Sequence, residues 1–270
     1  EVAAYAHAHD PHHPTSTVTA GLDSMEVHWI KTKAPDIDIL GVNTYGDLEQ
    51  ALTRIRPFGW DKAYMITEWG PNGHWEVSKM PWGAPVEQSS EAKFRSYRQR
   101  YAAIKAKESE GCVGSYAFLW GQKQERTPTW YGVFLENGNE TESVEVMHYI
   151  WNNSWPQNRT PQIVSYTLND KTAYDNVAVK PGDQLNAVFK INDIDNDPIN
   201  YTWEVLPEST DLKDGGDKEA RPDKVDIIEI TNQNGVLKFK APVPGQYRLF
   251  VYADDGFGHS ATANVPFIVK

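Results

Sequence analysis

The stretch Ala63–Gly70, whose apolar run stops at the carboxylate of Glu68, constrains the fold of this chain more than any other part of the sequence. Its first residues are apolar or β-branched, and turn residues flank the stretch on both sides. This composition is typical of a strand buried on both faces in a parallel sheet. Glu68 stands where the apolar run stops, so we expect its carboxylate at the rim of a barrel, where active sites lie. The alternative is that Glu68 only caps the turn that follows.

Strands and helices alternate through the first half of the sequence. This alternation predicts parallel strands joined by right-handed crossovers, but it does not distinguish a barrel from an open sheet. No Gly-x-Gly-x-x-Gly motif and no Walker loop follows any of these strands, which excludes the usual nucleotide-binding folds. Besides the Glu68 strand, the expected helices are Glu1–His9, Asp47–Arg56, Glu87–Glu108 and Val144–Trp151, and the expected strands are Thr15–Gly21, Ile37–Gly46 and Cys112–Trp120.

A polar linker at Trp155–Thr160 separates this half from a region of short strands divided by turns. Strands of such length and spacing predict a β-sandwich. We therefore expect two domains, residues 1–156 and residues 157–270. The strands expected in the second domain are Gln162–Leu168, Gln184–Ile191, Ile199–Val205, Val225–Ile230, Gly235–Lys240, Gly245–Ala253 and Ala261–Val269.

Charge and composition narrow the classes of partner. The net charge of -11 and the pI near 5.2 argue against nucleic acid and anionic membranes, which repel an acidic surface. Ten Trp residues are unusual, because Trp is kept mostly for anchors and stacking faces, and sugar binding is one such use. Cys112 is the only cysteine and is expected to be a buried strand residue, so there is no disulfide framework. No segment has the length and apolarity of a membrane span.

The run Ile66–Gly70, Ile-Thr-Glu-Trp-Gly, resembles the seventh-strand signature of the clan A retaining glycoside hydrolases, and most closely their family 2 type of TIM barrel. The resemblance covers Glu1 to about Trp155. It implies the C-terminal half of a (β/α)8 TIM barrel, followed by an immunoglobulin-like β-sandwich, with Glu68 as the catalytic nucleophile. It also implies that the first four strands and the acid/base lie upstream, so that this piece alone is inactive.

The resemblance assigns roles to further residues. Tyr45, at the end of the preceding strand, would donate a hydrogen bond that holds Glu68 ionised and aimed; the alternative is a core tyrosine. Trp120 would form the floor of the sugar site; the alternative is a core residue that closes the barrel. The remaining substrate-binding candidates are polar or aromatic. Asn43 and Trp69 stand at the ends of strands. His74, Trp75 and Trp82 lie in the loop after Glu68, and for these three residues packing of the loop onto itself is an equal alternative. Trp130 and Tyr131 are weaker candidates of the same kind.

The segments Asp195–Trp203 and Pro244–Leu249 resemble immunoglobulin-, cadherin- and PKD-like modules appended to extracellular polysaccharide enzymes. This implies an extracellular, periplasmic or cell-surface location. Asp193, Asp195 and Asp197 alternate like the start of an EF-hand loop, but Pro198 stands where that loop needs glycine. A different calcium site that includes the turn at 254–255 stays open. We assign no metal ligand, and the resemblance implies no cofactor.

Two hypotheses follow. The first is a fragment of a retaining glycoside hydrolase that acts on poly- or oligosaccharides by double displacement, with a carbohydrate substrate as one partner. Its other partner would be the missing N-terminal half-barrel or a second copy of the chain. The second hypothesis is a non-catalytic carbohydrate-binding protein or adhesin. An Asn-Glu pair at the end of a buried strand upstream of Glu1 would support the enzyme.

Overall fold

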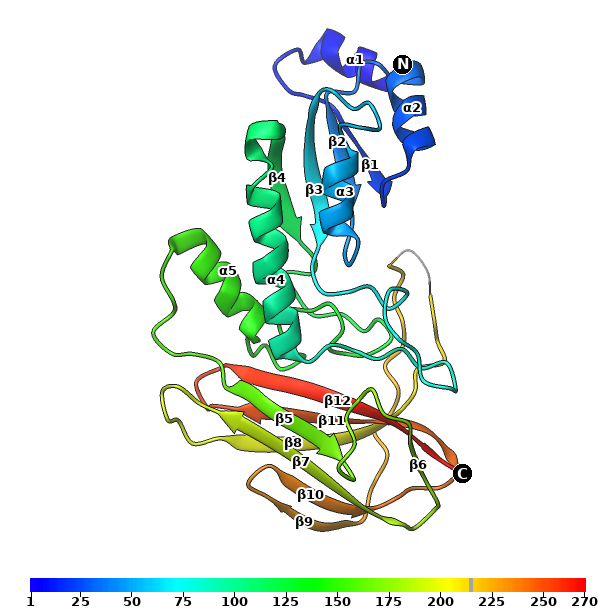
Figure 1. The fold of residues 1–270 in the computed structure, drawn as a ribbon, viewed down its shortest axis with the longest axis vertical. Helices are drawn as coiled ribbons and strands as arrows, with labels where there is room; N and C mark the ends of the chain where they lie inside the picture. Colours follow the sequence, from blue (N-terminus) through cyan, green and yellow to red (C-terminus); the bar gives the residue numbers. More distant parts are fainter. Residues whose placement is uncertain (214–215) are drawn as a thin grey trace. The chain divides into compact units, whose positions relative to one another are not determined.

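The computed structural model describes residues 1–213 and 216–270, and it divides into two compact units (Figure 1). Unit 1 contains Glu1–Pro71 and Arg98–Phe118, and unit 2 contains Asn72–Tyr97 and Leu119–Lys270. Unit 2 therefore includes segments of the expected first domain together with the whole of the expected second domain. The domain boundary between residues 156 and 157 stays a prediction.

Unit 1 is built on a parallel sheet of four strands in the order β1-β2-β3-β4. The alternation expected from the sequence is present, and Cys112 is buried. The expected last strand is too long, however, because β4 ends at Ala117 and Trp120 lies beyond it. The elements are α1 (Val2–His9), β1 (Ser16–Ala20), α2 (Ser24–Lys33), β2 (Ile39–Asn43), α3 (Leu48–Arg54), β3 (Ala63–Trp69), α4 (Ser90–Lys105, divided between the units), the 3-10 turn Glu108–Glu110 and β4 (Cys112–Ala117).

Helix α2 was not expected from the sequence. Only Val27 is buried within it, so the apolar repeat that reveals a helix is nearly absent. The helix begins because the Asp23 side chain accepts hydrogen bonds from the N–H groups of Met25 and Glu26. This capping satisfies two backbone donors that the first turn leaves without partners.

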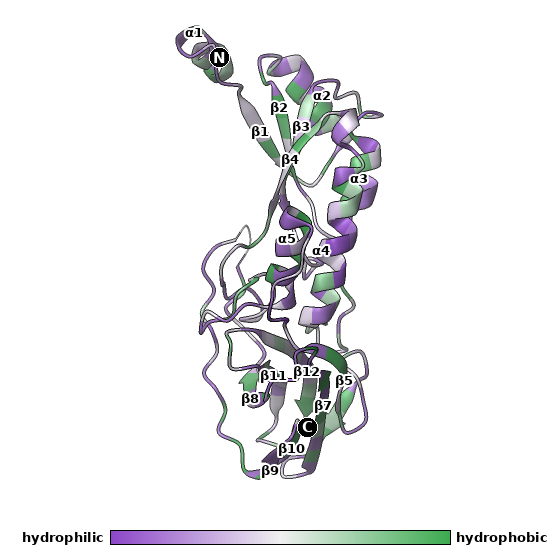
Figure 2. Cartoon of the chain, turned by 90° about the vertical axis from the view of Figure 1, so that its left-hand side faces the viewer, coloured by the Kyte–Doolittle hydropathy of each residue, from purple (hydrophilic) through white to green (hydrophobic). Residues whose placement is uncertain are grey.

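Three of the helices in unit 1 lie on one face of its sheet. Figure 2 shows α2, α3 and the second half of α4 along the same side of the strands. Leu40 and Val42 are completely buried on this side. A Cβ atom added to Gly41 would lie 2.8 Å from methyl carbons of Val18 and Thr67, so these residues share the opposite face. On the outer strand β1 that face remains open, since Val18 is half exposed.

Unit 2 contains a β-sandwich of two four-stranded sheets, ordered β5-β7-β10-β9 and β6-β12-β11-β8. This order matches the immunoglobulin arrangement, with a short extra strand, β6, parallel to β12. All but one of the expected strands are present. The strand predicted at Val225–Ile230 is wrong, because β9 begins only at Glu229. Strand β6 was not expected from the sequence. The elements of unit 2 are α5 (Glu142–Asn152), β5 (Gln162–Leu168), β6 (Val177–Val179), β7 (Gln184–Asn192), β8 (Asn200–Pro207), β9 (Glu229–Gln233), β10 (Val236–Lys240), β11 (Gly245–Asp254) and β12 (Ser260–Val269).

Strand β12 is buried on both faces. Its inner face contributes Ala263 and Phe267 to the core between the two sheets. Its outer face carries polar residues that are also buried, including Thr262 and Asn264. The backbone N–H of Thr262 donates to the Ser90 hydroxyl, so a segment from earlier in the chain covers this side of the sandwich.

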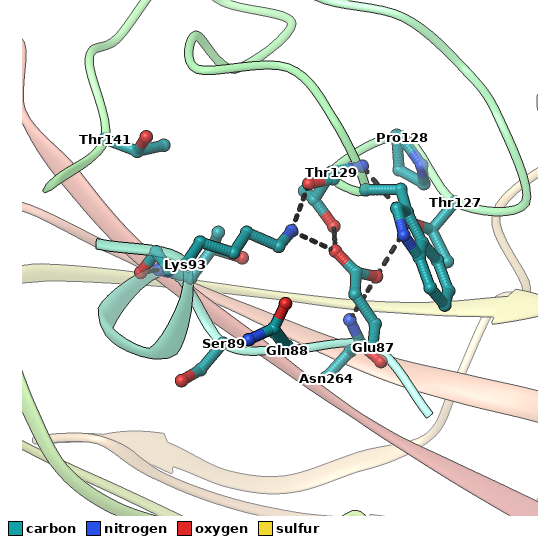
Figure 3. A network of polar contacts seen from close by, with 12 residues as sticks. Glu87, Gln88, Ser89, Lys93, Thr127, Pro128, Thr129, Thr141 and Asn264 are labelled. Atoms are coloured by element: carbon teal, nitrogen blue, oxygen red, sulfur yellow. Dashed lines mark hydrogen bonds and ion pairs between the residues drawn. The ribbon is translucent and has the colours of Figure 1, made fainter. Parts of the chain in front are cut away.

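A buried carboxylate, Glu87, connects that earlier segment to β12 (Figure 3). It accepts hydrogen bonds from Lys93 at 2.6 Å, from Thr127 at 2.7 Å, from Thr129 at 2.8 Å and from the Asn264 amide at 2.7 Å. Burial alone would raise the pKa of Glu87, but the Lys93 charge and these hydrogen bonds bring the pKa below its ordinary value. Glu87 is therefore a satisfied structural anion.

Across residues 1–213 and 216–270, no helix is both long enough and apolar enough to cross a bilayer. The extracellular, periplasmic or cell-surface location stays a prediction.

Candidate functional site

Glu68 and Tyr45 meet at the carboxyl ends of two neighbouring strands in unit 1. Tyr45 follows the end of β2, and its hydroxyl donates a hydrogen bond of 2.8 Å to Oε2 of Glu68 on β3. The two residues are held in register because the Thr44 N–H donates to the Glu68 carbonyl. The expected contact between the tyrosine and the carboxylate is present in the structure.

A β-bulge in β3 determines which way Glu68 points. Val42 pairs with Ile66, but the next residue of β2, Asn43, pairs with Glu68, so Thr67 is the extra residue. Burial along β3 alternates regularly up to Ile66, and after it Thr67 and Glu68 are both only half-buried. The bulge therefore places Glu68 on the open face of the sheet instead of the helix face. Bulges commonly re-aim a side chain beside a functional site.

The surroundings of the pair restrict its movement. Asn43 accepts a hydrogen bond of 2.7 Å from the Thr67 hydroxyl, which fixes the bulged residue. The Tyr45 ring is buried and meets the edge of Phe118 at a centroid distance of 6.1 Å. A carboxylate held by a buried tyrosine hydroxyl is oriented, and it keeps its second oxygen for another interaction.

Trp69 does not fulfil the substrate-binding role expected from the sequence. The same bulge turns it to the helix face, where it is fully buried and stacks near Tyr101 at 6.2 Å. Its indole offers no exposed surface to a ligand, so it is a core residue of unit 1.

The other aromatic candidates belong to unit 2. Trp120 is 49% exposed and contacts Phe134 and Trp151, each at a centroid distance of 5.4 Å. Its platform role stays a prediction. The weaker candidates Trp130 and Tyr131 are buried, and the Trp130 indole donates to the Asn72 carbonyl.

His74, Trp75 and Trp82 line one pocket of about 470 Å³ in unit 2. The His74 ring meets Trp75 edge to face at 4.9 Å. Burial and the nearby Arg126 charge lower the pKa of His74, so its imidazole is neutral at neutral pH. The sequence placed these three residues in one loop, but their convergence on a common cavity is a feature of the tertiary structure.

The aspartates Asp193, Asp195 and Asp197 bring one carboxylate oxygen each to within 4.8 Å of one another. They already accept protein hydrogen bonds, since Asp193 Oδ1 accepts from the N–H groups of Asp195 and Asp197. Oxygen donors at this separation suit a hard cation such as calcium. Among the residues that the structure describes, this carboxylate cluster does not include Asp254 or Asp255.

Several polar residues at the pocket lined by His74 were not expected from the sequence. Arg126, Glu208 and Ser209 line the same pocket as His74, and no local pattern marks them. Arg248 had a visible signal, because it interrupts an apolar run in β11, and it proves to be buried with an ion pair to Glu208 at 3.0 Å.

Comparison with known proteins gives weak likenesses. No family model matches the chain, and no curated sequence matches it. A calcium-binding mutant of Bacteroides uniformis beta-glucuronidase 2 is 12% identical over 100% of this chain, with a TM-score of 0.39; the chain spans 29% of its length. PcoC, a copper resistance protein from Escherichia coli, is 18% identical over 41% of this chain and 99% of its own, with a TM-score of 0.26. The PKD domain of an M14-like peptidase from a Thermoplasmatales archaeon is 16% identical over 42% of this chain and 97% of its own, with a TM-score of 0.25. These scores are too low to support a functional argument.

Proposed function

We propose that unit 1 is one half of a (β/α)8 barrel of a retaining glycoside hydrolase, and that Glu68 is its nucleophile. The observation that carries the proposal is the hydrogen bond from Tyr45 to Glu68 at the carboxyl edge of a parallel sheet. In β/α folds this edge is where catalytic groups lie.

The topology of unit 1 supports a barrel over an open doubly wound sheet. Its strands are consecutive in the order β1-β2-β3-β4, and α2, α3 and the second half of α4 lie on one face (Figure 2). A doubly wound sheet reverses its strand order and carries helices on both faces. The face opposite the helices bears small and apolar residues, including Gly41 and Val18, as the interior of a barrel would. Four further strands, from another part of the protein or from a second copy, would pair with the open edges of β1 and β4.

The proposed reaction is a double displacement. The Glu68 carboxylate attacks the anomeric carbon, the glycosidic C–O bond breaks, and the departing oxygen takes a proton from a second carboxylic acid. Water then attacks the glycosyl-enzyme ester, gives up a proton to that same group and releases Glu68. The second carboxyl group would stand about 5 Å from Glu68 and would come from the strands that complete the barrel. Tyr45 keeps the attacking oxygen oriented.

The test uses the protein as its gene encodes it, with a panel of aryl glycosides and the matching activated 2-fluoro glycosides. Glu68→Gln should fold normally and lose about 10³-fold or more in turnover, because the nucleophile is gone. Tyr45→Phe should lose about tenfold or more, the worth of a hydrogen bond to a charged group. Glu26→Gln, an exposed carboxylate on α2, is the matched control and should be fully active.

Mass spectrometry of the labelled protein identifies the nucleophile directly. The fluoro sugar should be found on the peptide that contains Glu68. A label on a different carboxylate would overturn the assignment. If no glycoside is cleaved and no label forms, the non-catalytic carbohydrate-binding protein or adhesin becomes the better account.

A further inference from the structure

The pocket of about 470 Å³ in unit 2 is assembled from several distant parts of the sequence. The loop after β3 supplies His74, Trp75 and Trp82. The segment that follows β8 supplies Glu208 and Ser209. Arg126 and Gln246 complete this side of the lining. The volume lies within the range of roughly 300–1,000 Å³ that is typical of small-molecule sites.

Four buried polar atoms of the lining residues have no hydrogen-bond partner among the residues that the structure describes. One of them, Nη1 of Arg126, is ion-paired with Glu219. The other three are Nε1 of Trp82, Oε1 of Glu208 and Oγ of Ser209. A buried polar atom without a partner is destabilising, so a pocket that keeps these three is suited to a ligand that satisfies them. One atom donates only, one accepts only and the hydroxyl does both. A ligand with several hydroxyl groups has the complementary set.

An aromatic surface lies beside these atoms. Trp75 is 57% exposed. Gly73 allows its side chain to fold back, since a Cβ at Gly73 would lie 2.6 Å from the indole. An indole ring offers a flat apolar surface against which the C–H face of a pyranose packs, while the hydroxyl groups at the rim of the sugar reach polar partners.

The charges at the pocket are mostly paired within the protein. Arg126 forms an ion pair of 3.2 Å with the buried Glu219, and Glu208 pairs with Arg248. Arg126 also has a left-handed backbone, φ 62°, and its N–H donates to Glu219 at 2.6 Å, so the strained residue is held in place. His74 is neutral at neutral pH. Lys79 also lines the pocket, but it is exposed, so its charge is hydrated by solvent. Because the buried charges are already compensated, the pocket favours an uncharged ligand.

We propose that this pocket binds a short chain of neutral pyranose sugars. Trp75 stacks on one ring, and the atoms of Trp82, Glu208 and Ser209 bond its hydroxyl groups. The site is separate from the proposed hydrolase chemistry, and no step of sugar binding depends on Glu68.

Titration by calorimetry and tryptophan fluorescence tests the proposal. The probes are cellotetraose, maltotetraose, xylotetraose, mannotetraose and galactotetraose, with tetragalacturonate as the charged comparison. The titrations use the full chain with Glu68→Gln, so that turnover does not consume the probes. At least one neutral probe should bind saturably and more tightly than tetragalacturonate.

Variants at the lining locate the bound sugar. Trp75→Ala should weaken binding tenfold or more, and Trp82→Phe, which keeps the packing and removes the N–H group, should weaken it several-fold. Trp29→Ala, a half-exposed Trp of unit 1, is the matched control and should leave the affinity unchanged. Circular dichroism verifies that each variant is folded.

The proposal is overturned if none of the neutral probes binds, if only tetragalacturonate binds, or if Trp75→Ala binds as tightly as the parent chain. Labelling at Glu68 by a fluoro sugar is independent of these titrations. Failure of the pocket and failure of the proposed hydrolase can therefore be told apart.

Discussion

Two buried glutamates three positions apart in α5 have opposite electrostatic environments. Burial raises the pKa of Glu142 to about 8, and Glu145 and Glu91 add to the rise, against smaller opposing effects of the Ser90 hydroxyl and the backbone. Both Glu142 carboxyl oxygens are buried without a hydrogen bond of normal length to any residue in the described part of the chain. Glu145, by contrast, accepts from Arg159 and from the Thr160 N–H at 2.9 Å.

This difference predicts a pH-dependent stability. The folded chain holds a proton on Glu142 that the unfolded chain releases above its ordinary pKa of 4.5, so stability should fall as the pH rises from about 4.5 to about 8. Glu142→Gln should remove this loss and stabilise the protein at pH 7.5 by up to about 4 kcal/mol, with little effect at pH 4. Urea unfolding of both proteins across this pH range measures the effect.

Glu145→Gln on the same helix is the matched control. It should destabilise the protein by about 1–3 kcal/mol at pH 7.5, because the Arg159 guanidinium loses the carboxylate that neutralises it. Losses of the same sign in both variants would show that Glu142 is ionised in the folded state.

At the scale of an element, the hairpin between β9 and β10 depends on one glycine. Asn234 and Gly235 form the two-residue turn with φ of 51° and 73°, the left-handed pair that a tight hairpin requires. A Cβ at Gly235 would lie only 2.3 Å from the Phe189 carbonyl oxygen, which is backbone and has little freedom to move away. The backbone of the adjacent strand β7 therefore leaves no room for a side chain at position 235.

Gly235→Ala should consequently cost more than an ordinary glycine at positive φ. Gly256, with φ 79° and no atom within 4 Å of an added Cβ, is the matched control. We expect Gly256→Ala to cost about 1–2 kcal/mol from the left-handed backbone alone, and Gly235→Ala to exceed that cost by at least about 1 kcal/mol. Equal shifts of the urea midpoint in the two variants would contradict the collision with β7.

At the scale of the whole molecule, the sandwich should fold as residues 158–270 but be less stable than a chain of residues 72–270. Most of its core lies between its own two sheets, yet Met80, Ala84 and Val86 belong to the same core cluster. Deleting them exposes apolar surface and the polar outer face of β12. Circular dichroism and thermal unfolding of both chains measure the difference.

The variant Asn264→Ala tests whether the shorter chain is less stable because it lacks specific contacts to residues 72–157, such as the hydrogen bond from Asn264 to Glu87. It should destabilise the longer chain more than the shorter one, because only the longer chain contains the Glu87 carboxylate to which Asn264 donates. If residues 158–270 show no cooperative transition, the sandwich is not an independent folding unit.

Local sequence patterns determined much of this protein. The alternation of apolar strands and amphipathic helices predicted the parallel sheet, and short alternating runs predicted nearly all strands of the sandwich, because each pattern depends only on which face of an element is buried. The contact between Tyr45 and Glu68 was expected from the resemblance to the glycoside hydrolases, and it is present because neighbouring parallel strands end at the same edge of the sheet.

Only the tertiary structure decided how those residues face their surroundings. The extra residue Thr67 turns Glu68 to the open face and Trp69 into the core, and a bulge of this kind depends on the partner strand, not on the run of residues itself. The pocket that includes His74 and Ser209 joins segments more than a hundred residues apart, and Glu142 keeps its proton because of what packs around it. A local pattern records the buried face of a segment, whereas long-range packing selects the neighbours that this face meets.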